Sequence, residues 1–226
     1  MKRETRGNPA PSTTALRDTA RERILAAAFA TLCEGGFAAL STREIAARAQ
    51  MSKRELYAEF GNKQGIFAAL VESRARRMRE PLASASVENA DAFAQTLFRA
   101  GLAFLTQLYD PAVVAVFRLA IAAATDSPEV PRTLEDRARA PNRDALRELM
   151  LQARNARLVS GEPAALTGRF LALLTGDIHI PLLLGVIEQP KQRELELCVR
   201  EAVAAFLQLH APTRRTTRRR RARRAA

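Results

Sequence analysis

The residues whose types and spacing suggest chemistry are concentrated between residues 41 and 63. The pattern Ser-x-Arg-Glu occurs there twice, at 41–44 and again at 52–55. A serine followed three residues later by a glutamate predicts a capping box. In this motif the hydroxyl accepts from a backbone N–H of the first helical turn, and the carboxylate accepts from the N–H of the serine. Both patterns therefore predict helix starts, and each cap is worth roughly 0.5–2 kcal/mol.

The eleven-residue spacing between the two patterns leaves room for one short helix and a turn. We expect helices over Thr42 to Ala49 and over Lys53 to Phe60, joined by a turn at 50–52. Two short helices joined by so tight a turn make a helix-turn-helix. The flanking helices, at 17–34 and from 63 onward, are expected to close a small core that leaves the second helix free to enter a major groove.

The second helix has one apolar side, defined by Leu56 and Phe60, when its residues are placed at about 100° intervals. Side chains on the opposite side meet base edges, and flanking side chains meet phosphates. We predict that Arg54 contacts a guanine and that Ala58 contacts a thymine methyl. Glu55 also points outward, but its capping box gives it an intrahelical partner. Lys53, Tyr57, Lys63 and Thr42 are the predicted phosphate contacts. The complete predicted set of DNA-binding residues is Thr42, Arg43, Ser52, Lys53, Arg54, Tyr57, Ala58 and Lys63.

Composition and charge agree with a helical protein that binds a polyanion. Hydrophobic residues make up 47% of the 226 residues, and Ala, Leu, Arg and Glu dominate, which favours helices. The formal net charge of +12 is uneven: residues 1–79 carry +7, residues 80–213 carry −3 and residues 214–226 carry +8. A basic front and a mildly acidic body indicate that the front meets the polyanion.

The chain divides into four predicted segments. Residues 1–16 are a predicted disordered arm, 17–63 a helix-turn-helix domain, 64–211 a second helical domain, and 212–226 a disordered Arg-rich tail. The first helix is expected to begin near Arg17 and to end at Gly35-Gly36. Further helices are expected near 89–108, 111–125, 131–157, 163–187 and 191–210. The predicted fold class is therefore all-α.

The segments ILAAAFATLCEGGFAALSTREIA and SKRELYAEF, followed by NK, resemble the DNA-binding domain of TetR/AcrR-type transcriptional regulators. The resemblance covers residues 17–63. The family pattern falls on Phe37, Thr42, Ser52, Leu56, Tyr57, Phe60 and Lys63. Two positions depart from it. The family often has Gly where this chain has Gln50, so the turn is expected to be shaped differently. It often has His or Tyr where this chain has Glu59, so a phosphate contact is expected to be missing there.

This resemblance implies an all-helical homodimer that binds double-stranded DNA and a small effector. Residues 110–187 look most like an AefR-like C-terminal domain, which binds ligand and dimerises. The dimer interface would use the helices near 163–187 and 191–210. Family members are mostly repressors that a small ligand releases from DNA. A two-fold dimer implies a palindromic operator with half-sites about 34–36 Å apart.

The second domain offers weaker indications of a ligand site. Its helices carry several aromatic residues, of which Phe93, Phe104 and Phe117 are the predicted lining of an apolar pocket, although ordinary core positions are the simpler explanation for most of these aromatic residues. Asp177 and His179 interrupt the most apolar segment, Leu171 to Ile187. Two interpretations stay open. In the first, Asp177 and His179 form a polar pair at the dimer seam, or an arginine such as Arg118 or Arg169 pairs with Asp177. In the second, Asp177 and His179 anchor a ligand.

Other classes of protein fit the sequence less well. Without a phosphate-binding loop, a nucleophile elbow or a metal-ligand cluster, we predict no enzyme, no catalytic residues, no metal and no cofactor. With no secretory signal and no continuous apolar span, we predict a cytoplasmic protein without a membrane partner. The alternative function is a sequence-tolerant, nucleoid-type protein, because the run Arg214 to Arg224 would bind any nucleic acid through counterion release. A solubilising extension explains this run equally well.

Overall fold

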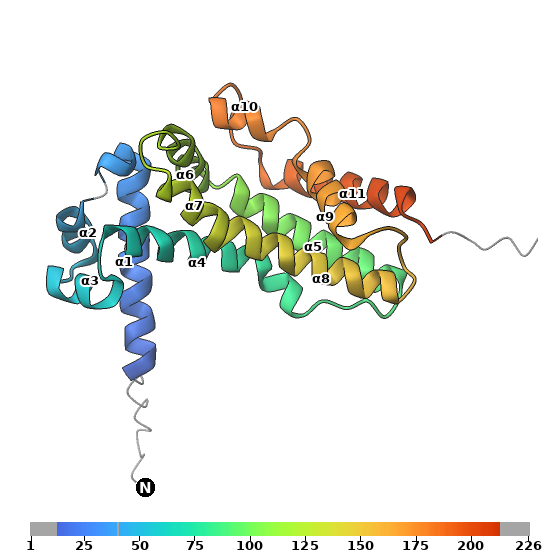
Figure 1. Ribbon diagram of the computed structural model, residues 1–226, viewed down its shortest axis with the longest axis horizontal. Helices are drawn as coiled ribbons and strands as arrows, with labels where there is room; N and C mark the ends of the chain where they lie inside the picture. Colours follow the sequence, from blue (N-terminus) through green and yellow to red (C-terminus); the bar gives the residue numbers. More distant parts are fainter. Residues whose placement is uncertain (1–12, 40, 213–226) are drawn as a thin grey trace, which may run out of the picture. The chain divides into compact units, whose positions relative to one another are not determined.

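The computed structural model describes residues 13–39 and 41–212, and within the first helix it describes the side chains of residues 20–32 and 34. Throughout these described ranges the secondary structure is helical and contains no strand (Figure 1). The predicted all-α class is therefore confirmed. Residues 1–12 of the predicted arm, the side chains of Cys33 and Phe37, and residues 213–226 of the predicted tail lie outside what the structure describes.

The helix-turn-helix has the predicted bounds. The second and third helices, α2 (Thr42–Ala49) and α3 (Lys53–Phe60), begin and end as the two Ser-x-x-Glu patterns predict. The first helix, α1 (Thr13–Ala39), is longer than predicted. It begins four residues earlier and continues through Gly35-Gly36, so the predicted end there is wrong. A glycine costs a helix about 1 kcal/mol relative to alanine, which a packed helix can tolerate.

The later helices are shorter and more broken than their periodicity indicated. They are α4 (Lys63–Ala83), α5 (Ala90–Leu108), α6 (Pro111–Ala122), α7 (Glu129–Leu134), a π-helical turn η1 (Glu135–Arg139), α8 (Ala140–Asn155), α9 (Pro163–Thr175), α10 (His179–Leu184) and α11 (Gln192–Leu209). The predicted helix 131–157 is interrupted by η1, because Pro141 has no N–H to donate to residue 137. The predicted helix 163–187 ends at Gly176, whose φ of +45° favours glycine.

The chain forms two compact units. The described residues of the first lie within Met1–Arg74 and Pro111–Ala138, and those of the second lie within Ala75–Asp110 and Arg139–Ala226. In the first unit α1 packs against α2 and α6, and α2 packs against α3 (Figure 1). Its core includes fully buried aliphatic side chains from four helices, namely Ile24, Ile45, Leu56 and Ile66. Each such side chain contributes about 1.5–3 kcal/mol on leaving water.

The second unit is built on α5, α9 and α11, with α8 packed against α9. Gly101 allows the close approach of these helices, since a Cβ there would lie 3.0 Å from side-chain carbons of both Leu174 and Val199. Phe170 and Phe206 meet edge to face, with ring centroids 5.2 Å apart. Among the described helices, none taken singly is long and apolar enough to cross a membrane, and only the broken pair α5 and α6 together has the length and composition to do so.

Candidate nucleic-acid interface

The start of α3 is a complete capping box. The Ser52 hydroxyl accepts from the Glu55 N–H at 3.2 Å, and the Glu55 carboxylate accepts from the Ser52 N–H at 2.8 Å. The Ser52 hydroxyl also donates to that carboxylate at 2.7 Å. These bonds, led by the one from the hydroxyl, hold the pKa of Glu55 below its usual value. Glu55 is therefore kept at the helix start, as predicted, and the Ser52 hydroxyl is already used both as donor and as acceptor.

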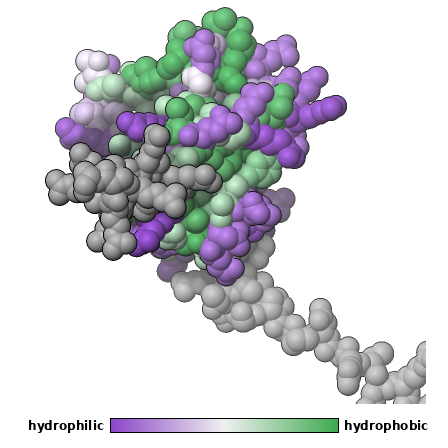
Figure 2. Space-filling view, turned by 90° about the vertical axis from the view of Figure 1, so that its right-hand side faces the viewer, coloured by the Kyte–Doolittle hydropathy of each residue, from purple (hydrophilic) through white to green (hydrophobic). Residues whose placement is uncertain are grey.

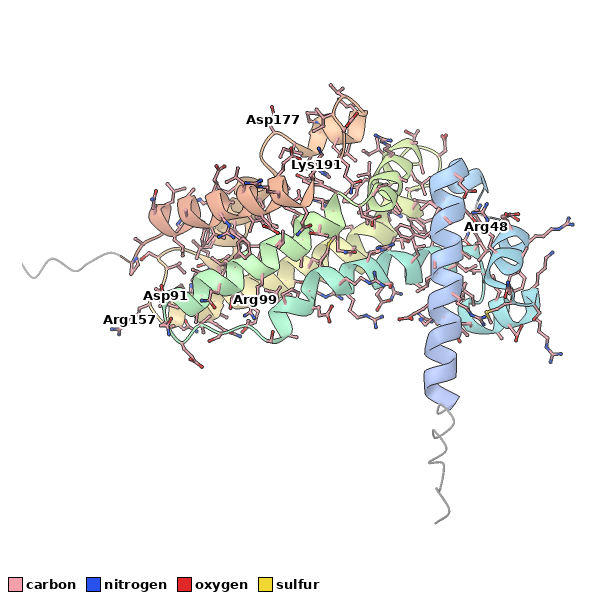
Figure 3. The ribbon with its side chains drawn as sticks, turned by 180° about the vertical axis from the view of Figure 1, so that it is seen from behind. Arg48, Asp91, Arg99, Arg157, Asp177 and Lys191 are labelled. Atoms are coloured by element: carbon pink, nitrogen blue, oxygen red, sulfur yellow. The ribbon has the colours of Figure 1, made fainter. Side chains whose placement is uncertain are left out.

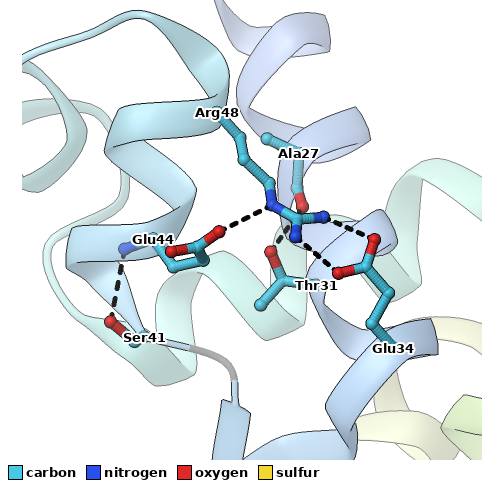
Figure 4. Close-up of polar contacts among 6 residues, drawn as sticks. All are labelled: Ala27, Thr31, Glu34, Ser41, Glu44 and Arg48. Atoms are coloured by element: carbon cyan, nitrogen blue, oxygen red, sulfur yellow. Dashed lines mark hydrogen bonds and ion pairs between the residues drawn. The ribbon is translucent and has the colours of Figure 1, made fainter.

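The start of α2 is only half of a capping box, so the prediction of two complete boxes is wrong. The Ser41 hydroxyl accepts from the Glu44 N–H at 3.3 Å. The Glu44 carboxylate, however, accepts from Arg48 Nε at 2.8 Å (Figure 4). Arg48 also donates from Nη1 to Glu34 of α1, at 2.7 Å, and that bond lowers the pKa of Glu34. The arginine thus draws Glu44 away from the serine and ties α2 to α1.

The turn between α2 and α3 has a left-handed residue. Gln50 has φ 54° and ψ 47°, and its N–H donates to the carbonyl of Ala47 at 3.2 Å. The next N–H, of Met51, donates to the carbonyl of Ala46 at 2.9 Å. The expectation that a non-glycine residue would change the turn is therefore wrong. Gln50 adopts the strained conformation, because these hydrogen bonds close the end of α2.

The predicted base-reading and phosphate-binding side chains of α3 share its exposed side. Leu56 and Phe60 are buried, as the helical wheel predicted. The predicted contacts on the exposed side of this helix are Lys53, Arg54, Tyr57 and Ala58. Tyr57 is 46% exposed although it is aromatic, so packing does not explain its place. The exposed side of α3 is therefore open to a partner.

The remaining predicted DNA contacts lie at the starts of α2, α3 and α4. Thr42 is half-buried, and its hydroxyl lies 3.2 Å from that of Tyr57, which joins two predicted phosphate contacts from different helices. Arg43 is exposed on α2, and Ser52 is exposed at the start of α3. Lys63 opens α4, where burial lowers its pKa. The structure brings Thr42 and Tyr57 into contact.

The junction of α3 and α4 is fixed by glycine and asparagine. Gly61 ends α3 with φ 73°, and the Asn62 side chain accepts from the Gly65 N–H at 2.8 Å. A Cβ on Gly65 would lie 1.9 Å from the carbonyl oxygen of Phe60, which is closer than any two such atoms can come. The backbones of α3 and α4 meet here without room for a side chain.

One residue that positions α3, Arg21, was not predicted to do so. Arg21 of α1 donates from Nη1 to the Glu59 carboxylate at 2.7 Å. Its Cζ also lies 4.9 Å from the centroid of the Phe60 ring. No local pattern reveals a contact across 38 residues, whereas the spacing of Glu44 and Arg48 is a recognisable helical ion pair.

The structure places the predicted ligand-binding residues in different environments. Phe93 is fully buried in the core of the second unit, and Phe104 is partly exposed in the same unit. Phe117 is partly exposed in the first unit. Asp177 is an exposed residue of the turn between α9 and α10 (Figure 3), so the expectation of an ionisable group inside an apolar helix is wrong. The helix ends before it, and an exposed carboxylate needs no buried partner. Its predicted ligand contact is not tested by this placement.

His179 lies at the start of α10, beside polar groups that close the end of α9. Its ring stacks with that of Tyr109, with centroids 6.1 Å apart. Burial, and then the charge of Arg139, lower the pKa of His179. Tyr109 donates to the carbonyl of Thr175 at 3.4 Å, and burial raises its pKa to about 12. The Cys198 thiol donates to the neighbouring carbonyl of Leu174 at 3.5 Å, and these two donors satisfy carbonyls that the helix end leaves open.

Exposed apolar side chains gather on the C-terminal helices. Figure 2 shows hydrophobic residues at the top of the view, over α10. The large hydrophobic side chains exposed on α10, on the loop after it and on α11 are Ile180, Leu184, Val186, Ile187, Leu197 and Leu209. Among the residues described, no group of three or more His, Cys, Asp or Glu side chains is placed to hold a metal ion.

Two family models match the chain. Residues 24–70 match that of bacterial regulatory proteins of the tetR family, and residues 95–212 match that of the C-terminal domain of AefR-like transcriptional repressors. None of the curated proteins compared with the chain matches it.

Solved structures with this fold include three bacterial or ligand-responsive regulators. A putative TetR-family regulator from Mesorhizobium loti has a TM-score of 0.72 and 22% identity, over 89% of this chain and 100% of that one. A TetR regulator from Agrobacterium tumefaciens has a TM-score of 0.69 and 28% identity, over 85% and 95%. The flavonoid-responsive regulator FrrA has a TM-score of 0.64 and 23% identity, over 87% and 100%.

Proposed function

Because this chain belongs to the TetR family of bacterial transcriptional regulators, we propose that it is a homodimeric repressor that a small, mainly apolar ligand releases from a palindromic operator. Its helix-turn-helix, α2 and α3, is a DNA-binding domain of that family. The observation that carries the proposal is the exposed side of α3, where Arg54 and Tyr57 are open to solvent while Leu56 and Phe60 are buried. A helix held in this way can enter a major groove.

The proposed DNA contacts are divided between bases and backbone. Arg54 reads a guanine edge, and Ala58 meets a thymine methyl. The phosphate contacts come from Lys53 and Tyr57 on α3, and from residues at helix starts, namely Thr42, Arg43, Ser52 and Lys63. A phosphate bond from the Ser52 hydroxyl would compete with its bonds to Glu55, so we expect this contact to be the weakest of the set.

The proposed dimer uses the exposed apolar side chains of α10 and α11. An apolar surface of this kind is stabilised by burial at roughly 25 cal/mol per Å². Ile180 and Leu184 on α10, with Leu197 on α11, are each more than half exposed in the single chain. A two-fold pair of chains would set two α3 helices about one DNA turn, or about 34–36 Å, apart.

We propose that the ligand acts through α4, which runs without a break from the first unit into the second. A ligand that tilts α4 would change the spacing of the two α3 helices and so lower operator affinity. The proposed ligand contacts are Phe93, Phe104, Phe117, Asp177 and His179, and the proposed location is the cytoplasm. Since the family and its structural neighbours are transcriptional regulators, we propose neither a catalytic role nor a cofactor.

The experiment is selection of binding sites from random duplex DNA, followed by affinity measurements with the full-length protein. The expected result is an enriched palindrome that binds far more tightly than random duplex, with two chains bound per site by light scattering. Equal affinity for the selected and the random duplex would instead support the sequence-tolerant alternative. The protein shortened at residue 212 then decides whether the Arg-rich segment carries that binding.

A further inference from the structure

The helix proposed to enter the major groove carries no net charge. Lys53 and Arg54 are matched by Glu55 and Glu59, and all four are exposed. Carboxylates on a helix that approaches a polyanion weaken binding unless their charges are offset nearby. Glu55 is held by the first turn of its own helix, where the backbone N–H groups favour negative charge. Glu59 lies at the opposite end of α3, where no such groups are available.

The offset for Glu59 comes from α1. Arg21 Nη1 lies 2.7 Å from the Glu59 carboxylate, and the two side chains are 35% and 33% exposed. The same guanidinium lies against the Phe60 ring, with Cζ 4.9 Å from its centroid. Arg21 is therefore held by two consecutive residues at the C-terminal end of α3. A salt bridge this exposed contributes little to the stability of the fold. We therefore expect the Arg21–Glu59 pair to matter for DNA binding instead.

We infer that Arg21 is a positioning residue for DNA binding, which neutralises Glu59 on the DNA-facing helix so that Lys53 and Arg54 set its effective charge. Glu59 follows Ala58, a proposed base contact, so its charge lies close to the DNA when α3 is in the groove. The inference rests on the proposed DNA contact of α3. It requires that loss of Arg21 and loss of Glu59 have opposite effects on DNA affinity.

The test compares Arg21→Gln, Glu59→Gln, the double variant and Arg21→Lys. Affinities are measured by fluorescence anisotropy from 50 to 200 mM salt, on the selected duplex and on a random duplex of equal length. Arg21→Gln should weaken binding about threefold or more and flatten the salt slope by about one. Glu59→Gln should tighten binding and steepen the slope by a similar amount. The double variant should return to within about twofold of the wild type, and Arg21→Lys should stay near it.

Two control variants change the net charge equally on the second unit. Arg99 on α5 (Figure 3) and Glu88 are both exposed. If Arg99→Gln and Glu88→Gln reproduce the two effects, overall charge explains them and the inference fails. It also fails if Arg21→Gln and Glu59→Gln both weaken binding, because this is what a purely structural contact would do.

Folding and function are kept separate by two further comparisons. If melting shows that Arg21→Gln is unfolded, the affinity of Glu59→Gln decides, since the inference predicts tighter binding and a purely structural contact predicts weaker binding. If selection yields no preferred duplex, the proposal of a sequence-specific regulator is wrong. The opposite effects of Arg21→Gln and Glu59→Gln can still be measured on random duplex. The two failures are therefore distinguishable.

Discussion

The hydroxyl groups of Thr42 and Tyr57 lie 3.2 Å apart and join the first turn of α2 to the exposed side of α3. The sequence did not predict a contact between these two residues, because each was predicted to bind phosphate by itself. Their contact places two hydroxyls from different helices at one point of the proposed interface. A single phosphate oxygen at that point could accept from one hydroxyl while the other orients it.

We predict that Tyr57→Phe and Thr42→Val each weaken binding to every duplex by about 1.5–3 kcal/mol, the range for hydrogen bonds to a charged group. If the two hydroxyls act as a unit, the double variant loses less than the sum of the single losses. Anisotropy titrations of the four proteins measure this cycle. Strictly additive losses would show that the two residues act independently, and an unchanged melting temperature would confirm that the fold is intact.

Arg54 and Lys53 are neighbours in the first turn of α3, and we predict that their losses differ in kind. Arg54→Ala should cost about 1–3 kcal/mol on the selected duplex and relax the preference at one base pair. Lys53→Ala should weaken all duplexes alike and flatten the salt slope by about one. Repeating site selection with each variant separates the two cases. Uniform weakening by Arg54→Ala would assign that residue to phosphate instead.

Gly65 should not tolerate even a methyl group. A Cβ there would lie 1.9 Å from the Phe60 carbonyl oxygen, so Gly65→Ala should force α3 and α4 apart and destabilise the protein by about 1–3 kcal/mol or more. Gly168→Ala is the matched control, since a Cβ at Gly168, inside α9, has no neighbour within 4 Å. The control should be neutral or stabilising by up to about 1 kcal/mol. Urea unfolding of both variants measures the difference in stability. Equal unfolding midpoints for Gly65→Ala and Gly168→Ala would contradict the prediction.

Gln50 should be improved by glycine. Its left-handed conformation, with φ 54°, costs a residue with a side chain roughly 1–2 kcal/mol. Glycine removes this cost but adds freedom to the unfolded chain, so we expect Gln50→Gly to stabilise the protein by up to about 1 kcal/mol. Gln50→Ala keeps the strain and should bring no gain. We expect Gln50→Gly to raise the unfolding midpoint and Gln50→Ala to leave it unchanged. An equal rise in both variants would point to an effect of the glutamine side chain itself.

The local structure of the helix-turn-helix could be predicted because its signals act over a few residues. A capping serine and its glutamate meet within one turn, so the starts of α2 and α3 follow from spacing alone. The buried side of α3 follows from the helical period in the same way. Breaks deeper in the chain were harder to predict. The helix that ends at Gly176 had the periodicity of a continuous one, and its end is decided where Tyr109 and Cys198 bond its last carbonyls.

The sequence by itself determined the all-α class, the family and the two helices of the helix-turn-helix, since helix period and capping are local properties of the chain. Only the tertiary structure decided which partners Glu44 and Glu59 take. Glu44 was predicted to bond Ser41, but Arg48 takes it, because α1 brings Glu34 alongside. Glu59 was expected only to repel phosphate, but it is paired with Arg21 from 38 residues away. The pairs of Arg21 with Glu59 and of Arg48 with Glu34 depend on how helices pack, which no local pattern encodes.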